Sequence, residues 1–522
     1  MATPIATDAV TRSVTQLLAS CAAMHGDRPA LLAPGREPLT YMGLDSQAAA
    51  TVGALNAQGV RRNDRVAVVL PNGPEMAAAF VSIAAGATCA PLNPAYRAEE
   101  FRFYLSDLDA KALVVDRSLD SPAVGVAESL GIPVLELTAS ELRPAGTFAL
   151  KPFSESTATS AAATPVFAEA DDVALVLHTS GTTSRPKIVP LSHANVCASA
   201  ANIACTLALT PDDRCLNIMP LFHIHGLMGA VLSSFTAGAA LVATPGFDVM
   251  KFFGWLDEFK PTWYSAVPTM HQIILARAER NREVVERSKL RLIRSSSAAL
   301  PPRVMRELEQ TFRAPVIESY GMTEAAHQMA SNPLPPKDRK PGSVGIAAGP
   351  EVAVMNEAGD LLPSGETAEI VIRGASVTTG YDKNPEANKA AFTAGWFRTG
   401  DQGYFDADGY LFITGRLKEI INRGGEKISP REVDEVLLDH PAVRQAITFA
   451  MPHRTLGEDV AAAIVLAEGA AADAKQIRDF ASERLAAFKV PSRVVFLDEI
   501  PKGPTGKLQR IGLAEKLGLT ST

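Results

Sequence analysis

The sequence lacks the features of a secreted, membrane-bound or nucleic-acid-binding protein. No apolar run reaches the roughly 18 residues that a membrane-spanning helix needs, and the chain does not open on a charged segment followed by an apolar one, as a secretory signal does. The net charge of -7 argues against nucleic acid or an anionic membrane as the main partner. We therefore expect a cytoplasmic enzyme or binding protein.

Cysteines are also few, and their spacing fits neither a metal site nor a disulfide framework. The chain has no CxxC pair and no His/Cys spacing typical of zinc ligands. We expect reduced thiols, most of them buried as small apolar residues. The five are Cys21, Cys89, Cys197, Cys205 and Cys215.

The remaining composition is that of a globular protein too long for a single core. Apolar residues make up 47% and charged residues 20% of the 522 positions, which is an ordinary balance. A chain of this length predicts two or more domains.

Strand-like and helix-like segments alternate through the first third of the chain. Short apolar runs at 65–70, 88–92 and 111–116 are separated by helix-like stretches at 75–85 and 98–108. This spacing predicts an α/β fold with parallel sheets and flanking helices.

The pattern changes towards the C-terminus. A Ser/Thr/Ala-rich stretch at 151–170 and a proline-rich one at 332–337 read as loops. Beyond about residue 350, strands such as 368–373 and 409–414 alternate with Gly/Asp turns, which predicts a β-rich subdomain. The last hundred residues predict a small α+β domain, with elements at 433–438, 446–450, 461–466 and 477–485.

A hydroxyl-rich loop, H-T-S-G-T-T-S-R-P-K at 178–187, follows a predicted buried strand. Parallel sheets bind ligands beyond the carboxyl ends of their strands, and phosphate needs hydroxyl donors and cations of this kind. The loop is not a nucleoside-triphosphate P-loop, because Ile188 stands where a hydroxyl would follow Lys187. A turn that caps a helix is the alternative interpretation. The predicted phosphate-binding residues are Thr179, Ser180, Gly181, Thr182, Thr183 and Lys187.

The same string is similar to the phosphate-loop signature of the adenylate-forming superfamily, which contains acyl-CoA synthetases, luciferases and peptide-synthetase adenylation domains. Further stretches resemble the family's other motifs in the family's order, and the resemblance covers roughly residues 12 to 515. They are P-L-F-H-I-H-G at 220–226, S-S-S-A-A-L-P at 295–301, E-S-Y-G-M-T-E at 318–324, W-F-R-T-G-D at 396–401, G-R-L-K-E-I at 415–420, G-G-E at 424–426 and P-K-G-P-T-G-K at 501–507.

The resemblance implies a nucleotide site. Tyr320 would stack on adenine, Thr323 would contact the α-phosphate, Glu324 would bind Mg²⁺, and Asp401 would accept from the ribose hydroxyls. The remaining residues implied to contact ATP or AMP are Ser297, Ala298, Ala299, Glu318, Ser319, Arg416 and Lys507.

It also implies an acid site and a mobile C-terminal domain. His223, Ser297 and His327 would hold the carboxylates of the acid, while a structural role remains the alternative for His327. His225 is a weaker candidate, because it lies two positions on and can point elsewhere. The groups implied to act in catalysis are Lys507, Thr323, Glu324 and His223.

The implied division is a domain at 1–415 that binds AMP and acid, a hinge at 416–418, and a C-terminal domain at 419–522. Lys418 would be the pivot of the hinge. Gly424, Gly425 and Glu426 would face CoA, because a turn without bulky side chains leaves room for its slender arm.

The implied reaction has two steps, acyl-adenylate formation from ATP and then thioester formation with CoA. The stretches around 178–187, 318–335, 340–346 and 421–430 look especially like those of oxalate–CoA ligases, so we expect oxalate as the acid. Ala326, Gln328, Ser319 and Gly321 depart from that pattern. The alternatives are malonate, a medium-chain or aryl acid, a luciferase-like oxygenase, and a nucleotide-binding protein without catalysis. We expect a monomer or homodimer.

Overall fold

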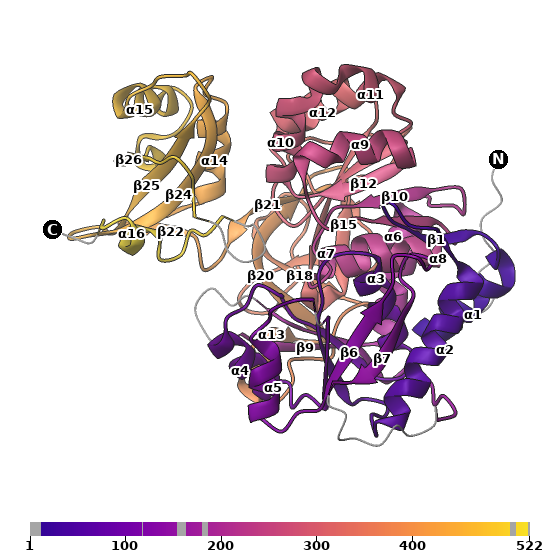
Figure 1. Cartoon of the computed structure of the whole chain (residues 1–522). Coiled ribbons are helices and arrows are strands. Elements are labelled where there is room, and N and C mark those ends of the chain that lie inside the picture. Colours follow the sequence, from indigo (N-terminus) through magenta and orange to yellow (C-terminus); the bar gives the residue numbers. More distant parts are fainter. Residues whose placement is uncertain (1–11, 117, 154–162, 180–185, 502–507, 520–522) are drawn as a thin grey trace.

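The computed structural model describes residues 12–116, 118–153, 163–179, 186–501 and 508–519. A large part of the chain, indigo to orange in Figure 1, carries three sheets, and a smaller yellow part beside it carries a fourth. This arrangement confirms the predicted α/β class. In the part of the chain that is described, no helix is long and apolar enough to cross a membrane.

The first sheet has seven strands in the order β7-β6-β5-β3-β4-β8-β9. Its central strands run parallel, and β7 and β9 are antiparallel edges. The strands are β3 (Arg65–Val69), β4 (Thr88–Pro91), β5 (Ala112–Asp116), β6 (Val134–Ala139), β7 (Phe148–Pro152), β8 (Val173–His178) and β9 (Ile188–Ser192). The alternation predicted at 65–116 is therefore confirmed, with helices α3 (Pro74–Ala84) and α4 (Ala98–Asp107) between these strands.

The loop predicted at 151–170 is correct only in part. Lys151 and Pro152 belong to β7, where they pair with β6. Residues 163–170 form neither helix nor strand, and 154–162 lie outside the described residues. Composition missed the strand because its alternating exposure gives only a weak apolar signal.

The second sheet has nine strands in the order β16-β15-β14-β13-β12-β10-β11-β1-β2. The run from β14 to β1 is parallel, whereas β2, β15 and β16 are antiparallel additions. Its strands are β1 (Pro29–Leu32), β2 (Leu39–Thr40), β10 (Arg214–Asn217), β11 (Ala240–Ala243), β12 (Trp263–Ala266), β13 (Leu292–Ser295), β14 (Val316–Met322), β15 (His327–Ser331) and β16 (Ile346–Ala347).

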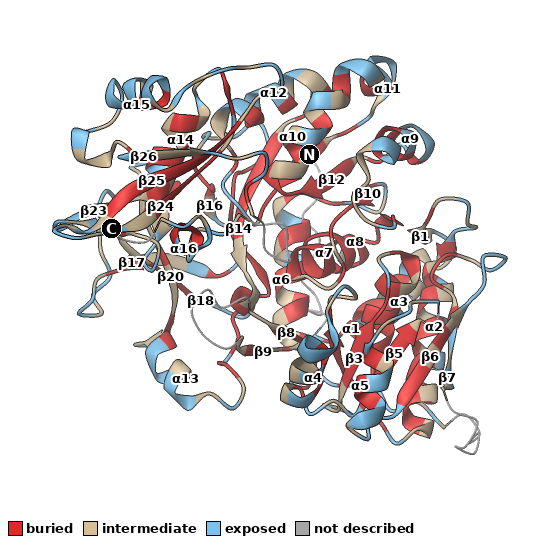
Figure 2. Cartoon of the chain, turned by 60° about the vertical axis from the view of Figure 1, so that its left-hand side comes forward, coloured by how far each residue is buried: buried red, intermediate tan, exposed pale blue. Residues whose placement is uncertain are grey.

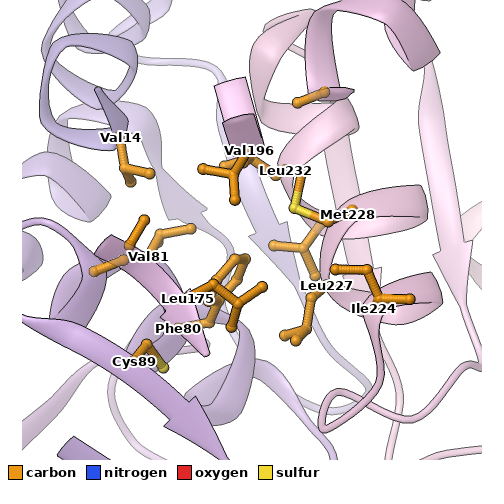
Figure 3. Close-up of a cluster of buried hydrophobic side chains, with 14 of the residues drawn as sticks. Val14, Phe80, Val81, Cys89, Leu175, Val196, Ile224, Leu227, Met228 and Leu232 are labelled. Carbon is orange, nitrogen blue, oxygen red and sulfur yellow. The ribbon is translucent and has the colours of Figure 1, made fainter. Parts of the chain in front are cut away.

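The main core lies between these two sheets. Helix α3 contacts β4 on one side and β11 on the other, and every residue of it except Glu75 is buried. A helix that is apolar all round has no face for water, so it belongs between layers. Figure 3 shows Phe80 and Val81 of α3 packed among Leu175, Leu227 and other apolar side chains. Figure 2 shows the strands β3 and β5 buried over most of their length.

The third sheet is the predicted β-rich subdomain, and the fourth belongs to the C-terminal part. The third contains β17 (Glu351–Met355), β18 (Ala368–Arg373), β19 (Phe392–Thr393), β20 (Trp396–Phe405) and β21 (Leu411–Arg416). The fourth contains β22 (Ile421–Arg423), β23 (Glu426–Ile428), β24 (Val443–His453), β25 (Gly457–Leu466) and β26 (Arg493–Phe496). A long β24–β25 hairpin is covered by α14 and α15, and a separate apolar core forms there.

The remaining helical elements connect or cover these sheets. They are α1 (Val14–His25), α2 (Tyr41–Ala57), α5 (Ala123–Ser129), α6 (His193–Thr206), α7 (Ile224–Gly226), the π-helix η1 (Leu227–Leu232), α8 (Ser233–Thr236), α9 (Val249–Phe259), α10 (Pro268–Ala278), η2 (Glu279–Asn281), α11 (Arg282–Arg287), α12 (Pro302–Phe312), η3 (Thr323–Ala325), α13 (Pro385–Ala391), α14 (Pro430–Leu438), α15 (Ala474–Ser482), η4 (Ala487–Lys489) and α16 (Leu513–Lys516). The cysteines are all free thiols, and only Cys205 is exposed.

Candidate active site

A cavity of about 620 Å³ lies between the large part and the C-terminal part. One wall is formed by the loop after β13, the end of β14, and strands β20 and β21. The facing wall comes from α14 and from residues 508–511. Seven of the residues predicted to bind nucleotide line this cavity, namely Ser297, Ala298, Ala299, Ser319, Tyr320, Asp401 and Arg416.

Tyr320, Asp401 and Arg416 form one connected group on that wall. Asp401 and Arg416 lie opposite each other in the antiparallel β20–β21 pair, and Arg416 Nε lies 3.1 Å from Asp401 Oδ1. The Tyr320 hydroxyl donates to Asp401 Oδ2 at 2.5 Å. Burial, together with the nearby Asp401 charge, raises the pKa of Tyr320 well above its usual value. The hydroxyl therefore stays a donor, and Asp401 stays an oriented acceptor at the cavity edge.

The small-residue loop after β13 is held by a buried carboxyl group. Glu318 is 1% exposed, and its Oε1 accepts from the Leu300 N–H at 2.9 Å. Burial raises the pKa of Glu318 to about 7. Its side chain supports the loop that carries Ser297 and does not line the cavity. Glu318 thus supports the wall from behind, and its predicted contact with nucleotide remains a prediction.

Histidines form a buried layer beside Ser297. His225 Nδ1 lies 3.0 Å from Ser297 Oγ, and His225 Nε2 lies 2.6 Å from Ser265 Oγ. The His225 and His327 rings stack with centroids 5.1 Å apart. His223 accepts from the His225 N–H at 3.3 Å, where short α7 begins. The structure thus places His225, the weaker candidate, in contact with Ser297, whereas His223 contacts the backbone of His225.

A second group connects the phosphate loop to the magnesium motif. The Tyr381 hydroxyl donates to Glu324 Oε1 at 2.9 Å, and Lys187 Nζ lies 4.3 Å from the centroid of the Tyr381 ring. Burial raises the pKa of Glu324, and the Tyr381 hydrogen bond and the Lys187 charge oppose that rise. Thr323 is partly exposed beside Glu324 in η3. These contacts connect Lys187 to Glu324 through Tyr381, with Thr323 next to Glu324 in the chain, and the roles of these residues at a triphosphate site remain predictions.

The ends of the phosphate loop are also joined. The Thr179 N–H donates to the Lys187 carbonyl at 2.9 Å, at the mouth of the β8–β9 pair. The predicted residues Ser180, Gly181, Thr182, Thr183 and Lys507 lie outside the described residues. Among the residues that are described, no three His, Cys, Asp or Glu side chains form a cluster that could hold a metal ion.

Comparison with known families decides what this arrangement belongs to. Residues 18–382 match the AMP-binding enzyme family, and residues 432–507 match the AMP-binding enzyme C-terminal domain. The chain belongs to the AMP-binding enzyme family. The resemblance drawn from the motifs is thereby confirmed.

Known relatives of this AMP-binding enzyme match it over nearly their whole length. It is 46% identical to an oxalate–CoA ligase of Arabidopsis thaliana over 503 residues, covering 95% of this chain and 97% of the relative. An oxalate–CoA ligase of Saccharomyces cerevisiae is 43% identical, with 88% of each chain covered. The crystal structure of ATP-bound MatB from Rhodopseudomonas palustris superposes with a TM-score of 0.86 at 31% identity, covering 97% of this chain and 99% of MatB.

Lys418 and the residues predicted to face CoA do not line the cavity. Lys418 is exposed between β21 and β22, and the Leu417 N–H donates to the Gly400 carbonyl at 2.9 Å. Gly424 and Gly425 form the β22–β23 turn at φ of 60° and 98°, which favours glycine, and Glu426 is exposed after them. Their roles remain predictions.

An ion-pair network in the C-terminal part follows directly on the predicted catalytic lysine. Arg510 donates to Asp434 Oδ2 at 2.5 Å and to the Thr448 carbonyl at 2.7 Å, and its Nε lies 3.2 Å from Glu419 Oε2. The network joins the segment just after the predicted hinge to α14 and to the chain beyond 507. The cavity wall on this side is therefore tied to the hinge.

Tyr381, Ser265 and Arg294 were not predicted from the sequence. Tyr381 follows the plain loop T-T-G, and Ser265 stands alone in the strand W-Y-S-A, so neither has a local signal. Arg294 does have one, because a charged residue inside a central parallel strand is buried on both faces. That signal points to an unusual site without naming its ligand.

Proposed function

We propose that this AMP-binding enzyme is an ATP-dependent acid–CoA ligase that converts oxalate to oxalyl-CoA in the cytoplasm, as a monomer or homodimer. One observation carries the proposal. Tyr320, Asp401 and Arg416, which are predicted to bind the nucleotide, lie on the same cavity wall as Ser297. His225 and His327 lie behind Ser297. A short polar acid end beside a nucleotide site suits a small diacid. The two relatives named as oxalate–CoA ligases support this acid.

The first step activates the acid. A carboxylate oxygen attacks the α-phosphorus of ATP, pyrophosphate leaves, and an acyl-adenylate forms, so catalysis consists largely of positioning and charge stabilisation. Asp401 would accept from the ribose hydroxyls in the orientation that Tyr320 and Arg416 fix. Thr323 and Lys507 would stabilise charge at the α-phosphate, and the 178–187 loop would hold the β- and γ-phosphates.

Glu324 is suited to act as a ligand of Mg²⁺. Mg²⁺ in phosphate sites is usually bound through one or two carboxylates together with phosphate and water oxygens, and Glu324 is a single buried carboxylate oriented by Tyr381. When bound, Mg²⁺ would offset phosphate charge. Lys187, held over the Tyr381 ring, would approach the same phosphates.

The second step uses the other face of the C-terminal part. We take the domain from 1 to 415, the hinge from 416 to 418 and the C-terminal domain from 419 to 522. Rotation about Lys418 would withdraw Lys507 and bring Gly424, Gly425 and Glu426 to the active site, where they would face CoA. The thiol then attacks the acyl carbonyl, AMP leaves, and the thiol proton is released to solvent.

Measuring AMP release with CoA across four acids tests the proposal. Oxalate should be turned over far better than malonate, octanoate or 4-coumarate. Equal or better turnover of octanoate would discard a short polar acid, and a preference for malonate would move the assignment to the longer diacid. Acid-dependent consumption of O₂ without CoA would instead indicate the oxygenase.

Lys507→Ala tests the division of labour between the two steps. It should abolish acid-dependent pyrophosphate exchange, while thioester formation from supplied oxalyl-adenylate should continue. Lys516→Ala is the control, because Lys516 is exposed and its hydrogen bond among the described residues goes to Gln509. Normal adenylation by the Lys507→Ala enzyme would contradict the mechanism.

A further inference from the structure

A buried positive charge lies directly behind the acid end of the cavity. Arg294 on β13 is 0% exposed, between strands β12 and β14. Its Nη1 lies 3.0 Å from His327 Nε2, and its Nη2 donates to Gln328 Oε1 at 3.2 Å. Its Nε is buried without a partner in the described part of the chain. A ring nitrogen that accepts from a guanidinium carries no proton, and the glutamine amide is uncharged, so neither contact brings a negative charge to Arg294.

No carboxylate neutralises this guanidinium among the described residues. Besides His327, the titratable group that acts on it is the Cys215 thiol, and burial raises the pKa of that thiol far above its usual value, so the thiol is uncharged. Burial lowers the pKa of Arg294 to about 10, which still leaves it charged at neutral pH. A charge buried without a counter-ion costs folding stability, so its retention calls for a functional reason.

The surrounding residues are shaped around the Arg294–His327 pair. A Cβ on Gly229 of η1 would lie 2.8 Å from both Arg294 Nη1 and His327 Nε2, so a glycine makes the room for their contact. His327 has φ of 102°, which a non-glycine residue rarely adopts. Gln328 is fixed with its oxygen towards Arg294, because its Nε2 donates to Thr206 and to the Ala348 carbonyl at 3.1 Å each.

The contact also sets which nitrogen of His327 carries the proton. A guanidinium only donates hydrogen bonds, so His327 Nε2 must accept and the proton of the neutral ring lies on Nδ1. That nitrogen lies beside Gly321, where an added Cβ would be 3.1 Å from it, and Gly321 lines the cavity. An added Cβ on Gly321 would also overlap the His327 carbonyl oxygen, so the glycine lets the backbone of His327 pack directly against the cavity wall.

We propose that Arg294 is a positioning residue that makes the enzyme select acids with a second carboxylate. It acts through His327, by fixing the orientation of the ring that stacks on His225 beside Ser297, and through its own unneutralised charge behind the wall. The single carboxylate of a monocarboxylate must lie at the α-phosphorus in order to react, so Arg294 is left without a counter-ion. A diacid supplies one. The inference rests on the proposed acid–CoA ligase function and names a determinant of its substrate class.

The test compares oxalate with oxamate, in which a neutral amide replaces one carboxylate, in steady-state kinetics of the full-length enzyme. Arg294→Gln keeps a donor but loses the charge, whereas Arg294→Lys keeps the charge. We expect Arg294→Gln to lower the ratio of kcat/KM for oxalate to that for oxamate at least tenfold, mainly through the KM for oxalate. Arg294→Lys should restore most of the ratio.

A second pair of variants leaves the arginine in place. Gln328→Glu puts a carboxylate next to the guanidinium and neutralises it, and Gln328→Met removes the same hydrogen bond without adding charge. The ratio should fall in Gln328→Glu and persist in Gln328→Met, and this pair decides alone if Arg294→Gln does not fold. Equal losses in Arg294→Gln and Arg294→Lys, or an unchanged ratio in Gln328→Glu, would overturn the proposal.

The wild-type enzyme separates this inference from the proposed function. If the wild type turns over oxalate but the charge at position 294 does not change the oxalate-to-oxamate ratio, the inference is refuted and the proposed function stands. Preference of the wild type for octanoate would refute the proposed function. If malonate is preferred, malonate and its monoamide take the place of oxalate and oxamate.

Discussion

Replacing Glu318 with glutamine should make the protein's stability less sensitive to a rise in pH from acidic to neutral values. Glu318 is buried, and its pKa rises from 4.5 to about 7 on folding because burial disfavours the carboxylate. Between these two values the folded protein holds a proton that the unfolded chain has released, so stability falls as pH rises through this window. With 1.36 kcal/mol for each pKa unit, the loss by pH 8 is about 3 kcal/mol. The side chain of the Glu318→Gln variant would carry no charge and would keep an oxygen for the Leu300 N–H.

Urea unfolding followed by tryptophan fluorescence measures this effect in the relevant part of the chain. All three tryptophans, Trp255, Trp263 and Trp396, precede the predicted hinge. Glu318→Gln and wild type should be nearly equally stable at pH 5, and the variant should be more stable by about 3 kcal/mol at pH 8. Taking the difference between the two proteins cancels the other titrating groups. A difference that stays constant from pH 5 to pH 8 would refute a neutral buried Glu318.

Two substitutions in the nucleotide site have expected kinetic effects. Tyr381→Phe removes a donor from buried Glu324, a loss of about 1–3 kcal/mol, and should raise the Mg²⁺ concentration for half-maximal AMP release about tenfold. Tyr410→Phe is its matched control, because the Tyr410 hydroxyl also donates a hydrogen bond and its ring also lies under a lysine, but away from the cavity. An equal rise in the Mg²⁺ requirement of Tyr410→Phe would contradict the role of Glu324. Asp401→Asn breaks the ion pair with Arg416 and should raise the KM for ATP with the KM for CoA unchanged; a parallel rise in both would argue against a ribose contact.

The predictability of the fold follows from local patterns. The apolar runs at 65–70 and 111–116 are short, lie between helix-length segments, and became β3 and β5. Such a pattern predicts parallel pairing without reference to the rest of the chain. Strand β7 was not predicted, because a half-exposed antiparallel edge strand has the same composition as a loop. The local sequence pattern therefore predicts the interior strands of a parallel sheet better than its edge strands.

The site was predictable to the extent that its chemistry follows the motifs. Tyr320, Asp401 and Arg416 were assigned from three motifs by resemblance, and the sheet pairing brings them together. The histidine layer was less predictable, because facing Ser297 requires the turn of α7 that selects His225 over His223. No spacing in the sequence encodes that rotation.

The acid preference has a consequence for how relatives should be compared. At the acid end, the lining residues Ser297 and Gly321 are small and carry no charge. If Arg294 acts as proposed, the charge that favours a diacid lies one layer deeper, in contact with His327 and Gln328. An enzyme with the same cavity lining and a neutral residue at this place in β13 should then prefer a monocarboxylate. Placing an arginine there, with glycine at the position matching Gly229, should raise its kcat/KM for diacids relative to their monoamides. The arginine alone should not, because without that glycine its guanidinium has no room beside the histidine.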